Sequence, residues 1–238
     1  MSGPRFGNRI LDLLPPDERA FVARSLQPKA ELDDGFYIYR VGQKLKSVYF
    51  PISCVLSAVA IMRDGTGVET GTVGCEGIGG VQAALHVARV PSEMVCQVGG
   101  EAYSMSVDSF ERALAEMPYL RSLVDYYLQC LMNLMSQSIA CNRLHELTQR
   151  CARWLLLTRD RVGANEFHLT HEYLAYMLGV RRSGVTVAAG ILRDAGAISY
   201  QRGNMKILNA KKLERTSCEC YRVIADEFDR LLPPSGGS

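Results

Sequence analysis

Residues 169–198, LTHEYLAYMLGVRRSGVTVAAGILRDAGAI, decide the fold of the C-terminal third of the chain. Thr170 is a good cap for a helix that starts at the next residue and ends at Gly179. A second helix is predicted to begin after Val180 and to run to about Asp194. Ala175 and Gly179 supply the small residue and the flexible residue that two steeply crossing helices need at their contact and turn. The stretch therefore predicts a helix-turn-helix.

The second helix of this pair begins with polar and basic side chains, and its N-terminal end would enter the major groove of DNA. The following residues, ISYQRGNMKIL (198–208), form two short apolar runs around Arg202-Gly203-Asn204, which is typical of a β-hairpin wing. The alternative is an ordinary helical hairpin whose charged face is solvated. The predicted DNA-binding residues are Thr170, His171, Arg181, Arg182, Ser183, Thr186 and Arg202.

The charge distribution favours a nucleic-acid partner. Residues 147–215 hold twelve Lys and Arg against five Asp and Glu, whereas residues 1–146 hold thirteen against sixteen. A basic block of this size attracts polyanions, and neutralised phosphates supply much of the affinity for DNA. A basic surface that contacts another protein is the competing interpretation, because charge alone does not separate the two.

The region from residue 30 to residue 107 has a β-rich pattern. Short apolar runs at 36–41, 47–52, 53–62, 68–73, 92–98 and 101–107 alternate with glycines and with the turn pair Asp64-Gly65. Regularly spaced short strands of this kind predict an antiparallel barrel or sandwich. The interval 75–91 could hold a short helix packed in the barrel.

A long helix is predicted over residues 118–146. Apolar residues at steps of four and three mark a coiled-coil seam, which predicts a homodimer, although a single helix buried within one chain has a similar pattern. Shorter helices are predicted at 150–162 and 211–232. The seam residues are Leu120, Val124, Tyr127, Leu131, Leu134, Ser138 and Cys141.

A β-rich region, a long helix and a winged helix-turn-helix follow one another in the chain, and in this order the chain resembles the Crp/Fnr family of transcription regulators over about residues 8–215. Residues 169–198 match the family's helix-turn-helix without a gap. The resemblance implies an α+β fold in four parts. These are an antiparallel β-roll (a cupin-like jelly roll, similar to cyclic-nucleotide-binding domains) at 1–117, a dimerisation helix at 118–146, a winged helix-turn-helix domain at 147–232 and a disordered tail at 233–238.

The resemblance also implies function. It suggests a homodimer on a palindromic operator in double-stranded DNA, an effector bound in the roll, and RNA polymerase as a partner. Arg182 falls on the family's usual recognition arginine, and Thr170 falls on a phosphate-contact position. Ser183 and Val187 stand where well-known members carry glutamate and arginine. We therefore expect a different operator sequence.

The effector site departs further from the family pattern. Gly80 stands where cyclic-AMP-binding members have the ribose glutamate, and Pro91-Ser92 stand where they have an arginine–serine pair for the phosphate. Cyclic AMP is not expected to bind in the usual manner, although Arg89 could substitute. Any small-molecule effector would contact Gly79, Gly80, Arg89, Ser92, Met135 and Ser136, unless these glycines only form tight turns.

No cofactor or metal is predicted. The eight cysteines include no C-x2-C pair, so we expect reduced, apolar fillers. An N-terminal cysteine cluster for iron–sulfur sensing is missing, since the first cysteine is Cys54. His86 is a conceivable haem ligand or an ordinary surface residue.

The remaining composition narrows the class of protein. With 47% hydrophobic and 22% charged residues the chain can build real cores. Common catalytic motifs are missing, so an enzyme is not expected. The sequence contains no long apolar run for a membrane span or a secretion signal, and we expect a cytoplasmic protein.

Overall fold

The computed structural model describes residues 5–87 and 89–234, and its N-terminal half contains a β-roll of two antiparallel sheets. Both sheets share one hydrophobic core, to which Phe50, Leu56, Met105 and Phe110 contribute. One sheet has the order β1 (Ala30–Leu32), β7 (Gly100–Ser106), β3 (Ser47–Pro51), and the other has the order β2 (Tyr37–Tyr39), β6 (Glu93–Val98), β4 (Val55–Ile61), β5 (Gly67–Val73).

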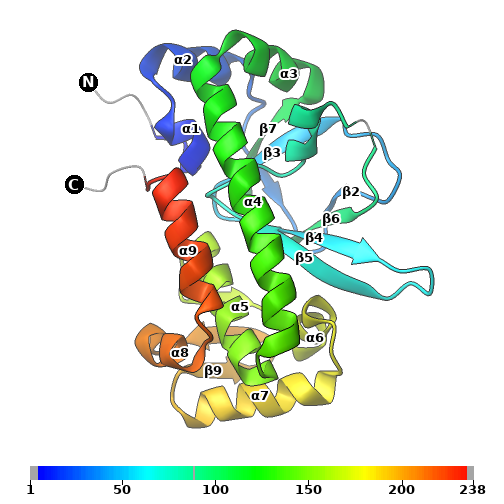
Figure 1. Cartoon of the computed structure of the whole chain (residues 1–238), viewed down its shortest axis with the longest axis vertical. Coiled ribbons are helices and arrows are strands. Elements are labelled where there is room, and N and C mark those ends of the chain that lie inside the picture. Colours follow the sequence, from blue (N-terminus) through cyan, green and yellow to red (C-terminus); the bar gives the residue numbers. More distant parts are fainter. Residues whose placement is uncertain (1–4, 88, 235–238) are drawn as a thin grey trace.

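The turns of the roll follow from the sequence signals. β4 and β5 form a hairpin whose tip contains Gly65 at φ +84°, a conformation that glycine adopts without strain. The predicted short helix is present as a 3-10 helix, η1 (Val81–Leu85), in which Val81, Ala83 and Ala84 are buried and Leu85 is exposed. Figure 1 shows the strands gathered on one side of the long helix α4.

Four helices frame the roll. Pro16 occupies the first position of α2 (Pro16–Ser25), so the chain breaks after α1 (Arg9–Leu13). Ser106 caps α3 (Val107–Glu116) by accepting a hydrogen bond from the backbone N–H of Ser109. After Met117, α4 (Pro118–Leu144) runs for 27 residues along most of the long axis of the molecule (Figure 1).

The C-terminal part contains five helices and a three-stranded sheet within the described residues. The predicted wing is present as β9 (Ile198–Gln201) and β10 (Asn204–Ile207), and β8 (Glu166–His168) adds a third strand that the sequence did not indicate. The helices are α5 (Leu147–Val162), α6 (His171–Leu178), α7 (Arg182–Asp194), α8 (Ala210–Thr216) and α9 (Cys220–Leu231).

The prediction of a single helix over 211–232 was wrong. The chain breaks at 217–219 into α8 and α9, and α9 returns along α4 (Figure 1). The rings of Tyr127 on α4 and Phe228 on α9 meet edge to face at 6.4 Å. Arg9 donates hydrogen bonds to Asp229 at 2.9 Å and to the carbonyl of Leu232 at 3.0 Å. These contacts bring the end of the described chain beside its beginning.

The predicted seam on α4 needs a correction, because most of it faces the chain's own core. Tyr127 is fully buried and packs over Gly77, where an added Cβ would lie only 2.3 Å from the Tyr127 hydroxyl oxygen. Leu131 and Ser138 are half-buried. The seam residues buried within the chain are Leu120, Val124, Tyr127, Leu134 and Cys141.

A different apolar face of α4 is left uncovered. Tyr126, Met132, Met135 and Ile139 are all exposed, and Ile139 reaches 73% exposure. Met132, Met135 and Ile139 recur at steps of three and four, so they follow one side of the helix, whereas Tyr126, six residues before Met132, faces another side. None of the described helices is long and apolar enough to cross a lipid bilayer.

Candidate nucleic-acid interface

The helix-turn-helix forms as the sequence predicts. Thr170 caps α6 by accepting a hydrogen bond from the N–H of Tyr173 at 3.1 Å. Gly179 ends that helix at φ +63°, in the left-handed region that favours glycine. Ala175, Val185 and Ala188 are buried between α6, α7 and α5, so the apolar faces of the pair are used inside the domain.

The opposite face of α7 is open to solvent. Arg181, Arg182, Ser183 and Thr186 are all exposed at its N-terminal end. Neither arginine has an ion-pair partner in the part of the chain that the structure describes. Val187 is 65% exposed one turn further on, and an apolar side chain there suits the methyl group of thymine. This face offers cationic, hydroxyl and apolar groups to a groove.

The wing places one further cation beside this face. Arg202 and Gly203 form the tip between β9 and β10 with φ values of +48° and +87°, which fits the two-residue hairpin turn that needs both in the left-handed region. A Cβ on Gly203 would lie 2.7 Å from the ring of His168 on β8. Glycine there lets the third strand approach, while Arg202 stays exposed.

His171 connects the helix-turn-helix to the wing within the head, the C-terminal part of the chain made of α5 to α8 with β8 to β10. Its Nδ1 lies 3.2 Å from the Thr186 hydroxyl on α7, and its ring stacks on Tyr200 of β9 at 4.1 Å. Burial lowers its pKa, and the charge of Arg182 lowers it further, so the neutral ring is favoured near pH 7. His171 and the capping residue Thr170 hold the geometry from half-buried positions, whereas the other five predicted residues are exposed.

Two polar contacts that the sequence did not predict, one buried and one partly buried, join the roll to the C-terminal part. Arg161 at the end of α5 donates from Nε to Glu76 at 2.8 Å, and both side chains are less than a tenth exposed. Glu69 on β5 accepts from the Trp154 indole at 3.0 Å and from Ser57 at 2.8 Å. Loss of water around Glu69 raises the pKa of its carboxyl group.

The structure does not gather the predicted effector residues into one cavity. Gly79 exchanges backbone hydrogen bonds with Tyr49, and Leu56 occupies the space where its Cβ would be. Arg89 donates to the carbonyl of Gly42 and lines an open groove on the outside of the roll.

The remaining effector candidates lie apart from that groove. Gly80 lies against the Ser47 carbonyl, and Ser92 is half-buried near Tyr39. Met135 and Ser136 are exposed on α4. The cavity between β5, α4 and α5, lined by Thr70, Leu134 and Trp154 among others, measures about 20 Å³, which is room for about one water.

The histidine and cysteine predictions have mixed outcomes. His86 lies on the surface, 3.2 Å from Glu111, with a side chain 77% exposed, so it does not face an enclosed haem site. All eight cysteines are unpaired and seven are buried, as expected of fillers. Three of them, Cys141, Cys218 and Cys220, also meet beside His145, a grouping that the sequence did not indicate.

Comparisons with known proteins agree with this geometry. Residues 149–216 match the profile of the Crp-like helix-turn-helix domain. No curated protein sequence matches the chain. Among solved structures, FixK2 of Bradyrhizobium japonicum is 13% identical with a TM-score of 0.68, covering 80% of this chain and 96% of that one.

Two further structures show the same similarity. The c-di-GMP-responsive regulator CLP of Xanthomonas campestris is 13% identical with a TM-score of 0.65, covering 81% of this chain and 99% of that one. A CRP-family transcriptional regulator from Thermus thermophilus is 21% identical with a TM-score of 0.65, covering 79% and 96%. These are structures of regulators rather than of enzymes.

The fold and the exposed basic helix define a protein with a winged helix-turn-helix. More specifically, the chain carries a Crp-like helix-turn-helix domain on the overall fold of Crp/Fnr transcription regulators.

Proposed function

We propose that this protein is a sequence-specific transcription regulator that binds a palindromic operator as a homodimer. The observation that carries the proposal is the N-terminal end of α7, where Arg181 and Arg182 are exposed, as is the wing residue Arg202. A recognition helix enters the major groove with this end, and an arginine can hold a guanine through two hydrogen bonds.

The uncovered face of α4 supports the dimer. Met132, Met135 and Ile139 present apolar surface that a second copy of the chain would bury. Two copies related by a two-fold axis along α4 would carry both α7 helices at the same end of the assembly. Symmetric dimers of this kind read two half-sites about one helical turn, roughly 34 Å, apart.

The roll is proposed to have lost the usual binding mode for cyclic AMP. Gly80 and Pro91 replace the acidic and basic side chains of that mode, and Arg89 is held on the outer side of the roll by the Gly42 carbonyl. Losing a charge-assisted contact to the phosphate would cost about 1.5–3 kcal/mol. Contact with RNA polymerase is proposed from the family resemblance.

Substitution of Arg182 tests the DNA-binding proposal. The operator is first selected from random duplexes with the full-length protein, and affinity is then measured by fluorescence anisotropy at one fixed salt concentration. We expect Arg182→Ala to lose about 1–3 kcal/mol, roughly 5- to 150-fold, on the operator and to relax the preference at one base position.

Arg193→Ala is the matched control. Arg193 lies at the other end of α7 and pairs with Asp194 at 3.0 Å. We expect it to bind the operator within about twofold of the wild type, because surface ion pairs contribute little. An Arg182→Ala protein with wild-type operator affinity and base preference would remove the support for the proposal.

A further inference from the structure

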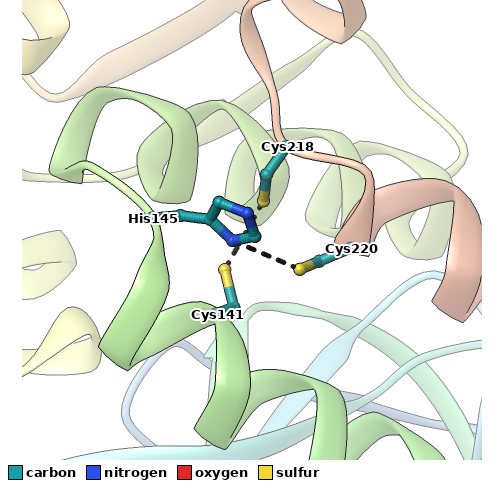
Figure 2. Close-up of side chains that lie close together, drawn as sticks. All are labelled: Cys141, His145, Cys218 and Cys220. Carbon is teal, nitrogen blue, oxygen red and sulfur yellow. Dashed lines mark hydrogen bonds between the residues drawn. The ribbon is translucent and has the colours of Figure 1, made fainter.

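A compact group of three thiols and one imidazole lies where α4 meets the α8–α9 junction. Cys141 and His145 are four residues apart at the end of α4, so they lie on one face of that helix. Cys218 lies in the break between α8 and α9, and Cys220, on the other side of Glu219, is the first residue of α9. Figure 2 shows the four side chains directed toward a common centre. Their ligand atoms all lie within 4.8 Å of one another.

We propose that Cys141, His145, Cys218 and Cys220 form a tetrahedral zinc site. In such a site Zn–S bonds of ~2.3 Å and Zn–N bonds of ~2.0 Å place two sulfurs ~3.8 Å apart and a sulfur and a nitrogen ~3.6 Å apart. The Sγ atoms of Cys141 and Cys218 are 3.5 Å apart, as are Sγ of Cys220 and Nδ1 of His145 (Figure 2). Both separations match tetrahedral edges to within a few tenths of an ångström.

The orientation of His145 supports a metal ligand rather than a chance neighbour. Its Nε2 lies 3.2 Å from a carboxylate oxygen of Glu219, so the ring proton on that nitrogen can be donated to Glu219. The lone pair of Nδ1 is then free to point at the thiols. Metal-binding histidines show this arrangement, in which an outer carboxylate fixes the tautomer and the ring orientation.

The surroundings suit thiolates. The Nε2 amide of Gln137 donates to Sγ of Cys220 at 3.1 Å, and Arg150 and Arg153 on α5 act electrostatically on Cys141. Three thiolates and one Zn²⁺ leave one net negative charge, which these cations offset. The three cysteines are buried and form their own small cluster, apart from the main core. A closed site with four protein ligands is typical of structural zinc.

The position of the site, between α4 and the start of α9, gives the zinc a structural role that goes beyond the proposed function. His145 lies in the short connection from α4 to α5, Cys218 lies in the break before α9, and Cys220 is the first residue of α9, the helix that returns along α4. Since 73 residues separate His145 from Cys218, one ion would hold together segments far apart in the chain. The metal would fix the junction between the long helix and the DNA-binding head.

Metal analysis of the full-length protein tests the site without any DNA. The protein is produced in zinc-supplemented medium with a tag that lacks histidine, passed over a chelating resin, and analysed by mass spectrometry for metals. We expect about one zinc per wild-type chain and less than about a fifth of that in Cys218→Ser. Cys130→Ser is the control, because Cys130 lies on the same helix against α9 but outside the group, and it should retain the wild-type zinc content.

A second set of measurements keeps the proposal testable if Cys218→Ser fails to fold. Cobalt loaded into the wild type should give the visible spectrum of a tetrahedral ion and a near-ultraviolet thiolate charge-transfer band. Cys220→His keeps four ligands and should bind cobalt with a weaker charge-transfer band. Glu219→Ala should keep the metal with about 10-fold lower affinity.

Three results would overturn the proposal. The wild type could be folded by circular dichroism yet hold less than about a tenth of a zinc per chain. Cys218→Ser could hold as much zinc as the wild type. The isolated protein could contain iron with inorganic sulfide, or a Cys141–Cys218 disulfide, in place of zinc.

Discussion

The buried pair of Glu76 and Arg161 offers a sharp test of how the roll and the head are joined. Replacing Glu76 with Gln removes the negative charge and leaves the shape nearly unchanged. The Arg161 guanidinium would then lack its counter-ion in a site where its side chain is 5% exposed. The hydrogen bond from Arg161 to the carbonyl of Leu157, at 3.1 Å, does not involve Glu76 and would remain.

The size of the effect follows from this burial. Removing one partner of a buried ion pair costs about 3–5 kcal/mol, because the other charge stays desolvated and unmatched. Gln can still accept one hydrogen bond from Arg161 or from the Gly74 N–H, so we expect about 3 kcal/mol. For a chain of this length each kcal/mol lowers Tm by about 2–4 °C, which gives a loss of about 6–12 °C.

Differential scanning calorimetry at neutral pH measures this loss, and an exposed pair supplies the control. Arg121 and Asp125 form an i,i+4 pair on α4 at 3.1 Å, with both side chains at least two-fifths exposed. Asp125→Asn should cost less than about 0.5 kcal/mol. Equal small shifts in both variants would refute the reasoning, because burial would then contribute nothing.

Two further predictions concern pH and assembly. Burial raises the folded-state pKa of Glu69, so ionisation of this carboxyl group opposes folding. The stability of the wild type relative to Glu69→Gln should therefore fall as pH rises from about 4 through the raised pKa. Urea unfolding at several pH values measures this difference, and a difference that does not depend on pH would contradict the prediction. Ile139→Glu should halve the mass found by analytical ultracentrifugation with an unchanged circular dichroism spectrum, because it places a charge on the proposed dimer face. Met62→Glu, on the exposed β4–β5 hairpin, should leave the mass as it is, and an Ile139→Glu protein that stays dimeric would argue against this face.

The strands, the wing and the helix-turn-helix were predictable because their signals are local. Gly179 and the Arg202-Gly203 turn each adopt a left-handed backbone conformation, which the residue types at and beside these positions indicate. The basic start of α7 was predictable for the same reason, since it depends only on residues next to one another. His171 was assigned to DNA contact, and its stacking on Tyr200 was missed because that partner lies 29 residues away.

The dimer seam and the thiol group were not predictable from local patterns. The long helix is apolar on more than one side, and a heptad count cannot tell which side α9 will cover. Tyr127 and Phe228 illustrate this, because their contact depends on the break between α8 and α9. The same break brings Cys218 and Cys220 to Cys141. Each spacing alone, C-x3-H or C-x-C, is a weak signal.

The return of α9 along α4 has a consequence for dissecting the protein. A fragment cut at residue 147 would contain every residue proposed to contact DNA, yet Tyr221, Ile224 and Phe228 would lose the surface that now covers them. The matching fragment that ends at 146 would expose Tyr127 and its neighbours to water. Burial of such side chains contributes about 1.5–3 kcal/mol each, so both pieces would be prone to aggregate. The C-terminal helix-turn-helix part and the long helix α4 therefore fold as a single unit, although the proposed function gives one to DNA binding and the other to dimerisation.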